Sequence, residues 1–185
     1  MIEAIAERVR WKPEEIPVEW IEDLLRIPGY NAIATAGESL FDEELAQTAL
    51  DFFPECLTHV EGELAGQPFN LEPWQKAIVA NIFGWVRLDR YGRWVRRYKE
   101  VFILIARKNG KSPLAAGIAI LAFFLDEMKG KQCYLAAADR EQASVVFRHC
   151  KGMVENTDVL SSRCKIYGGG GSNFQNRSIV QEDEN

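Results

Sequence analysis

The first part of the chain carries apolar residues at helical spacing. This pattern predicts helices at Glu14–Leu25, Asp42–Phe53 and Leu71–Leu88. The run Phe41-Asp-Glu-Glu44 is typical of a helix start, with a capping position followed by an acidic first turn. Pro28-Gly29 ends the first of these segments. The pattern therefore predicts a helical amino-terminal segment.

Strand and helix patterns alternate in the later part of the chain. Arg93–Tyr98 alternates and is rich in aromatic residues, which predicts a short strand. Val101–Ala106 and Lys131–Ala138 are unbroken apolar runs, as expected of parallel strands that are covered on both faces. Helical patterns follow them at Pro113–Leu125 and Arg140–Val154. The alternation predicts an α/β fold with right-handed crossovers and a binding site at the carboxyl ends of the parallel strands.

The pattern after residue 160 is less regular. Ser161–Tyr167 is compatible with a further strand. Gly168–Ser172 is a glycine tract, either a linker or a loop between strands, and Ser178–Val180 offers only the start of a strand.

Composition and charge narrow the class of protein. The chain has 185 residues, enough for a domain with its own core, and a net charge of -5, which argues against a globally basic nucleic-acid binder. It shows no apolar run of membrane-spanning length and no secretory signal, so no membrane partner is expected. The four cysteines are widely spaced and predict reduced thiols. These features together predict a cytoplasmic protein.

The junction of Val101–Ala106 with the helix that follows it has the order of a phosphate-binding loop: strand, turn, Gly-Lys-Ser, helix. Backbone amides of such a turn point at phosphate oxygens. Lys111 would neutralise the outer phosphates, and the Ser112 hydroxyl would ligate Mg²⁺. The predicted ligands are ATP and Mg²⁺, and the turn residues involved are Arg107, Lys108, Asn109, Gly110, Lys111 and Ser112. The usual pattern has a further glycine where this chain has Ile105, so a surface turn that happens to contain Gly-Lys-Ser is the alternative.

Single residues in and before the turn have further possible roles. Arg107 could stabilise charge on the γ-phosphate as an arginine finger in cis, or it could form a positioning ion pair or be a solvated arginine. Gln75 could pair with the adenine edge through its amide, with Trp74 packing nearby; the alternative is a surface glutamine beside a core tryptophan. For Lys108, a solvated surface charge is the favoured interpretation.

A basic cluster with interleaved aromatic residues precedes the predicted strand Val101–Ala106. It could follow a phosphate backbone or simply be a solvated strand face. Its members are Arg87, Arg90, Arg93, Arg96 and Arg97, with Trp94 and Tyr98 between them.

Three ordered motifs resemble the large terminase subunits of tailed phages, over about residues 65 to 160. Ala106-Arg-Lys-Asn-Gly-Lys-Ser112 resembles their deviant Walker A loop, which has an early arginine and lacks the first glycine. Leu71-Glu-Pro-Trp-Gln75 resembles their adenine-binding motif, and Ala136–Ala143 resembles the segment after their second strand.

The resemblance implies a P-loop NTPase fold of the ASCE type: a three-layer α/β domain with a parallel sheet, incomplete here. Residues 1–65 would be a helical amino-terminal segment, and residues 66–185 would be the first half of the ATPase domain. Lys111 and Arg107 would act in catalysis. Gln75, Trp74 and the turn would bind the nucleotide, with Ser112 on the metal.

The resemblance also implies a function, a DNA-packaging motor that uses ATP to drive viral DNA into a procapsid. The implied partners are double-stranded viral DNA, a portal protein and a small terminase subunit. The full-length form would be a homo-oligomeric ring in the cytoplasm of a bacterial host.

The chain departs from this family pattern near residue 180. Ile179–Glu184 supplies no Walker B strand, and no acidic cluster of a nuclease is present. Nucleotide binding with absent or feeble hydrolysis is therefore expected. A helicase-like P-loop ATPase and a non-catalytic prophage remnant are the alternatives, although Arg107 and Lys108 favour the terminase spelling over the helicase one.

Overall fold

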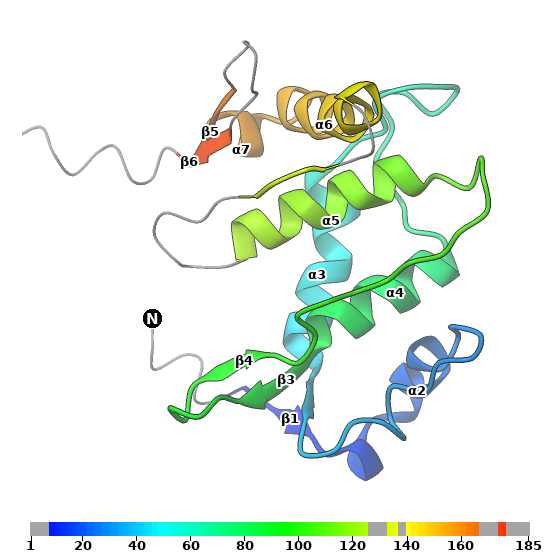
Figure 1. Ribbon diagram of the computed structural model, residues 1–185, viewed down its shortest axis with the longest axis vertical. Helices are drawn as coiled ribbons and strands as arrows, with labels where there is room; N and C mark the ends of the chain where they lie inside the picture. Colours follow the sequence, from blue (N-terminus) through cyan, green and yellow to red (C-terminus); the bar gives the residue numbers. More distant parts are fainter. Residues whose placement is uncertain (1–7, 126–132, 137–139, 167–173, 177–185) are drawn as a thin grey trace, which may run out of the picture. The chain divides into compact units, whose positions relative to one another are not determined.

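The computed structural model describes residues 8–125, 133–136, 140–166 and 174–176, and it has mixed α and β structure (Figure 1). The chain forms two compact units, which are described separately. The first consists of Met1–Phe52 with Asn70–Leu104, and the second of Phe53–Phe69 with Ile105–Asn185. The glycine tract Gly168–Ser172 and the start of a strand expected at Ser178–Val180 lie outside the described residues.

The first unit combines a small sheet with helices. Its elements are β1 (Arg10–Trp11), the 3-10 helix η1 (Pro13–Glu15), α2 (Val18–Leu24), β2 (Leu40–Asp42), the beginning of α3 (Glu43–Cys56), α4 (Pro73–Gly84), β3 (Trp85–Leu88) and β4 (Trp94–Arg96). The strands pair in the order β1-β2-β3-β4, and every pair is antiparallel. The helix predicted at 42–53 is confirmed as α3. The one predicted at 14–25 is shorter, because α2 spans only Val18–Leu24, and the one predicted at 71–88 ends at Gly84, where residues 85–88 form β3 instead.

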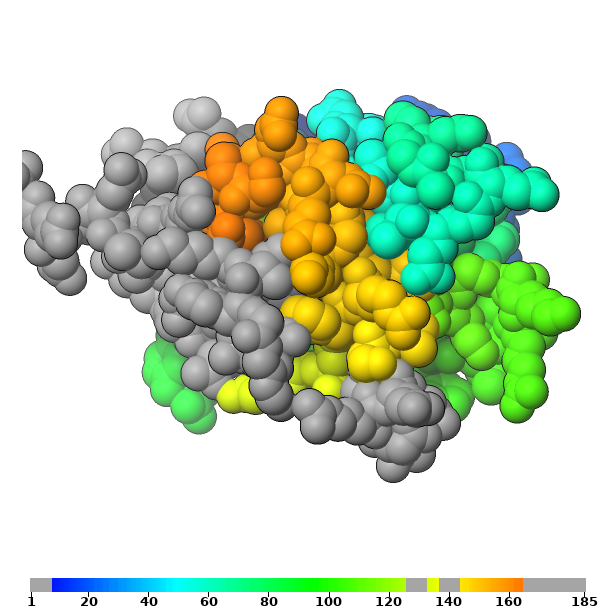
Figure 2. Space-filling model, turned by 90° about the horizontal axis from the view of Figure 1, so that it is seen from above, coloured from blue at the N-terminus to red at the C-terminus, as the bar shows by residue number. Residues whose placement is uncertain are grey.

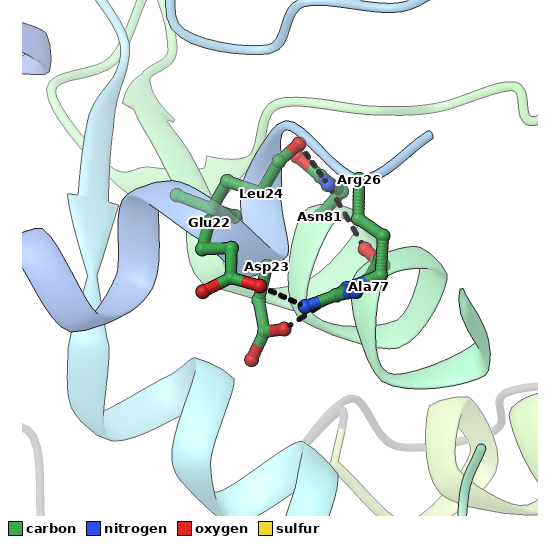
Figure 3. Close-up of polar contacts among 6 residues, drawn as sticks. All are labelled: Glu22, Asp23, Leu24, Arg26, Ala77 and Asn81. Atoms are coloured by element: carbon green, nitrogen blue, oxygen red, sulfur yellow. Dashed lines mark hydrogen bonds and ion pairs between the residues drawn. The ribbon is translucent and has the colours of Figure 1, made fainter. Parts of the chain in front are cut away.

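Aromatic rings hold the core of the first unit together. The ring of Phe41 meets Trp20 and Trp85 edge-on, at centroid distances of 5.2 and 5.5 Å. A buried amide joins two helices across this core: Asn81 of α4 donates to the carbonyl of Leu24 at the end of α2, at 3.1 Å (Figure 3). Tertiary contacts of this kind stabilise helices that are short on their own.

The second unit is built around two helices. After the last turn of α3 it contains α5 (Lys111–Leu125), α6 (Arg140–Glu155), α7 (Asp158–Ser161), β5 (Cys164–Ile166) and β6 (Phe174–Asn176). The two strands pair antiparallel. Helices α5 and α6 pack side by side (Figure 1). The predicted helices at 113–125 and 140–154 are therefore confirmed, and β5 lies within the strand suggested for 161–167.

Glycines and a long connection complete the packing of the second unit. A Cβ on Gly117 of α5 would lie 2.5 Å from the ring of Phe53, and one on Gly152 of α6 would lie 2.4 Å from the side chain of Val60. Residues 57–69 pack against α6 through this contact, and Figure 2 shows them beside that helix.

Burial raises the pKa of the Cys150 thiol on α6 to about 12.

The predicted parallel sheet is not found in the part of the chain that the structure describes. Val101–Ala106, expected as its central strand, is not a strand, and neither are residues 133–136 of the second expected strand. Phe102 and Leu104 are 90% and 88% exposed, so the run is not covered on both faces. A parallel strand depends on neighbouring strands for its hydrogen bonds and on helices for its faces. The prediction of a parallel sheet required neighbours that the described residues do not supply.

Candidate functional site

The turn before α5 has an unusual backbone. Lys108 has φ of 68° and Gly110 has φ of 65°, so two left-handed residues stand close together before Lys111 begins the helix. A lysine rarely adopts this conformation, because its Cβ crowds the backbone there. Alternation of left-handed residues turns successive backbone amides toward one side and creates an anion-binding concavity. The local geometry therefore suits a phosphate group.

The start of α5 adds further donors to this turn. The first amides of a helix have no acceptor within it, and the helix dipole places partial positive charge there. The amides of Lys111 and Ser112 occupy these positions, whereas Pro113 has none to offer. The next amide, of Leu114, donates to the carbonyl of Gly110 at 3.1 Å and closes the turn onto the helix.

The side chain of Lys111 folds back over the turn. Its Nζ donates to the carbonyl of Ile105 at 3.4 Å, and the side chain is exposed to solvent. An ammonium group has three donor hydrogens, so two remain for an incoming anion. The lysine is thus held beside the amides that would meet a phosphate.

Arg107 begins the turn and is exposed to solvent. It forms no ion pair with any residue that the structure describes. Lys108 and Asn109 are also exposed, as is expected of residues at the mouth of a turn. The six predicted turn residues are consecutive in the chain, and the last two of them begin α5. Among the described residues Arg107 has no positioning ion pair, whereas its other alternative role, a solvated arginine, agrees with its exposure.

The fit of this turn to a magnesium nucleotide depends on the donor types. Ser112 supplies a half-buried hydroxyl at the second position of α5. Mg²⁺ keeps several waters and takes few protein ligands when phosphates hold it, so a single hydroxyl is compatible with its needs. Among the described residues there is no cluster of three or more His, Cys, Asp or Glu that could bind a metal by itself. A metal here would therefore depend on the phosphates.

Gln75 lies in the first unit and has a structural role there. It is buried at the start of α4, where it forms a capping box with Glu72. Its Oε1 accepts from the amide of Glu72 at 2.9 Å, and the Glu72 side chain accepts from the amide of Gln75. Oε1 keeps a second lone pair and the amide nitrogen keeps its hydrogens, so contact with an adenine edge stays a prediction. Trp74, beside it, is half-buried.

The basic cluster contains both an arginine held by hydrogen bonds within the unit and arginines that are exposed to solvent. Arg97 is structural: it donates to the carbonyl of Ala32 at 3.0 Å and to the backbone and side chain of Thr35. Its guanidinium also lies 5.3 Å from the Trp85 ring. Arg87 and Arg90, by contrast, are exposed. Sequence spacing treated these arginines alike, because only tertiary contacts distinguish them.

Comparison with known proteins agrees with the resemblance in the motifs. The family described as "Terminase large subunit, ATPase domain" matches residues 73–167. The chain belongs to this family. The "Terminase, large subunit" of Enterobacteria phage HK97 is 35% identical to the chain over 96 residues. That match covers 51% of the chain but only 17% of the relative's length. No solved structure matches the chain significantly.

The segment that matches the terminase family contains the candidate site residues. The terminase segment, residues 73–167, includes Trp74, Gln75 and the whole turn before α5. It also includes all of α6 and the segment 136–143 that carried the third motif, although Asp139 of that motif lies outside the described residues. The described part of the chain contains no helix long and apolar enough to span a membrane.

Proposed function

We propose that this chain is the ATP-binding part of a phage DNA-packaging motor, in which ATP drives viral DNA into a procapsid. One observation carries the proposal. Inside the segment that matches the terminase ATPase family, a Gly-Lys-Ser turn with two left-handed residues leads directly into the first turn of α5. Backbone amides, a helix amino terminus and one ammonium group, all in this segment, are the kinds of donor that bind a triphosphate.

Each residue of the turn has a role in this proposal. The amides of residues 107–112 bind the phosphate chain, and Lys111 neutralises its outer charge. Arg107, exposed and without an ion pair among the described residues, stabilises charge on the γ-phosphate. Ser112 ligates Mg²⁺, which when bound would neutralise the β- and γ-phosphate oxygens. Gln75 and Trp74 bind the adenine.

The proposal extends to fold and partners. Residues 66–185 belong to a P-loop ATPase domain, preceded by a helical segment at residues 1–65. In that domain Val101–Ala106 would pair with neighbouring strands as a central parallel strand, which would bury the apolar side chains of Phe102 and Leu104 between helices. The partners are double-stranded viral DNA, a portal protein, a small terminase subunit and further copies of the chain in a ring.

A binding titration tests the site. Fluorescent ATP should bind the chain, and should bind more tightly with magnesium than without it. Lys111→Ala should weaken binding at least about tenfold, because truncating one partner of a close charge pair costs about 2 kcal/mol or more. Lys151→Ala, which removes an exposed lysine of α6 in the same unit, is the matched control and should bind as the unaltered chain does.

Two outcomes would contradict the proposal. If Lys111→Ala binds ATP as well as the control does, the turn is not the phosphate site. If the unaltered, folded chain binds no nucleotide at all, the segment is a protein module that lacks this activity, as the alternative of a non-catalytic remnant holds.

A further inference from the structure

The β3–β4 hairpin of the first unit concentrates positive charge in a chain whose net charge is -5. Between residues 85 and 99 the acidic residue is Asp89, and the basic residues are Arg87, Arg90, Arg93, Arg96, Arg97 and Lys99. The strands pair through Val86 with Arg96 and Leu88 with Trp94, so the turn at residues 89–93 connects two well-registered strands. In Figure 1 this turn points away from α2 of the same unit.

The turn is held rigidly by Asp89. Its Oδ1 accepts from the amides of Tyr91 and Arg93 at 2.8 and 3.0 Å, and its Oδ2 pairs with the Arg93 guanidinium at 2.8 Å. These contacts hold the pKa of Asp89 below its usual value. The backbone hydrogen bond from Arg93 is the largest cause. Gly92 adopts φ of 73°, which the turn requires. The tip is therefore ordered before any ligand arrives.

The tip presents two guanidinium groups around one aromatic ring. Tyr91 is 65% exposed, and its ring lies 4.7 Å from the Arg90 guanidinium and 5.1 Å from that of Arg93. Arg93 is neutralised by Asp89, but Arg90 and Arg87 form no ion pair with any residue in the described ranges. Two uncompensated, exposed guanidiniums thus lie on an ordered hairpin, one of them stacked on Tyr91.

From this arrangement we infer that the β3–β4 hairpin binds the phosphate backbone of duplex DNA through Arg87 and Arg90, with Tyr91 as the residue that positions Arg90. The inference rests on the proposed function only for the choice of DNA as the polyanion. The hairpin itself is separate from the nucleotide turn in the chain and is tested separately.

The chemistry favours the backbone over the bases. Guanidinium groups fork onto phosphate oxygens and keep their charge at any physiological pH. Binding of single strands relies on bare aromatic faces on which bases stack. The guanidiniums of Arg90 and Arg93 already lie 4.7 and 5.1 Å from the Tyr91 ring and compete with a base for its faces, so this ring is a poor stacking platform. Contacts to phosphate alone carry no sequence information, and the hairpin should therefore bind duplexes regardless of their sequence.

The experiment measures binding of the whole chain to a fluorescent duplex of about 30 base pairs, by anisotropy over a salt series without nucleotide. Arg87→Gln with Arg90→Gln should weaken binding about a hundredfold at roughly 50 mM salt. It should also make the slope of log K against log salt shallower by about 2, since each phosphate contact contributes about 0.9. Tyr91→Ala should weaken binding about two- to tenfold by releasing one long side chain, and Tyr91→Phe should restore it.

The controls distinguish binding at the hairpin surface from a general effect of net charge and from loss of folding. Lys76→Gln with Arg163→Gln removes the same charge from exposed positions outside the hairpin, and should change affinity less than about threefold, because contacts to phosphate act locally. Circular dichroism checks that each variant folds. Binding of fluorescent ATP is measured on the same variants, so loss of nucleotide binding and loss of DNA binding are distinguishable.

Several results would overturn the inference. The unaltered chain could fail to bind the duplex, the two control substitutions could weaken binding as much as the hairpin substitutions, or the hairpin variant could bind normally. A clear preference for the single strand of the same sequence would also count against it, because it would assign the binding to base stacking.

Discussion

At the scale of single residues, a buried ion pair between Arg10 and Asp42 joins β1, at the edge of the sheet, to β2. Arg10 Nε lies 3.1 Å from Asp42 Oδ2, with the Asp42 side chain fully buried and that of Arg10 nearly so. The Arg10 guanidinium also lies 4.4 Å from the Trp94 ring. Asp42 also caps α3, because its Oδ1 accepts from the amide of Leu45 at 3.0 Å, as the acidic run at residues 41–44 predicted.

Neutralising Asp42 tests the ion pair without removing the cap. Asp42→Asn keeps an oxygen for the amide of Leu45 but removes the negative charge that faces the nearly buried Arg10 guanidinium. We expect a loss of about 3–5 kcal/mol in the free energy of unfolding, measured by urea denaturation. Asp23→Asn breaks a more exposed pair with Arg26 and should cost less than about 1 kcal/mol. Equal losses in the two variants would show that the buried pair adds nothing.

The helices are the elements that local sequence predicted well. Side chains three and four positions apart share a face of a helix, and this spacing located α3, while α5 and α6 were expected as the helical segments that follow the two apolar runs. The same spacing extended α4 through Trp85–Leu88, which the structure places in β3. Those four residues pair with β2 and β4, and such non-local hydrogen bonds override a local helical preference.

Close approach to α5 depends on one glycine. A Cβ at Gly117 would meet the Phe53 ring at 2.5 Å and Leu57 at 3.1 Å. Gly117→Ala should therefore lower the free energy of unfolding by about 1–3 kcal/mol, the usual cost of overpacking, despite alanine's better helix propensity. Ala115→Gly, at an exposed position of the same helix, measures the effect of helix propensity by itself and should lower the free energy of unfolding by about 1 kcal/mol. A Gly117→Ala protein of greater stability would mean that Phe53 can move aside.

At the scale of the whole molecule, the exposed apolar run is the feature most open to unwanted contacts. Phe102 and Leu104 stand two residues apart in an extended segment and expose most of their surface. Unpaired apolar segments of this kind associate with other chains. Phe102→Gln with Leu104→Gln should therefore reduce the concentration-dependent increase in light scattering.

The matched control for this prediction is a single exposed apolar residue elsewhere. Val18→Gln, on α2, removes apolar surface from an isolated position and should leave the scattering unchanged. If the double variant associates as strongly as the unaltered chain, the run does not drive self-association.

The candidate site shows how local and non-local information divide. The turn at residues 107–112 was predictable because its residue types and the helix after it are contiguous in the chain, and backbone geometry there is set by near neighbours. The capping role of Gln75 was also within reach of sequence, since Glu72 stands at the spacing of a capping box, but the adenine prediction drew attention away from it. The division between structural Arg97 and exposed Arg90 was not, because it depends on residues over sixty positions away.

The sequence by itself determined the helices, the cap at Asp42, the Gly-Lys-Ser turn and, through its ordered motifs, the terminase family. These features depend on residues close together along the chain. Only the tertiary structure decided that Trp85–Leu88 is a strand, that the small sheet is antiparallel, and that Arg97 is held by hydrogen bonds whereas Arg87 and Arg90 are exposed. Strand pairing and burial depend on which distant segments supply hydrogen bonds and apolar cover, and no local pattern encodes that choice.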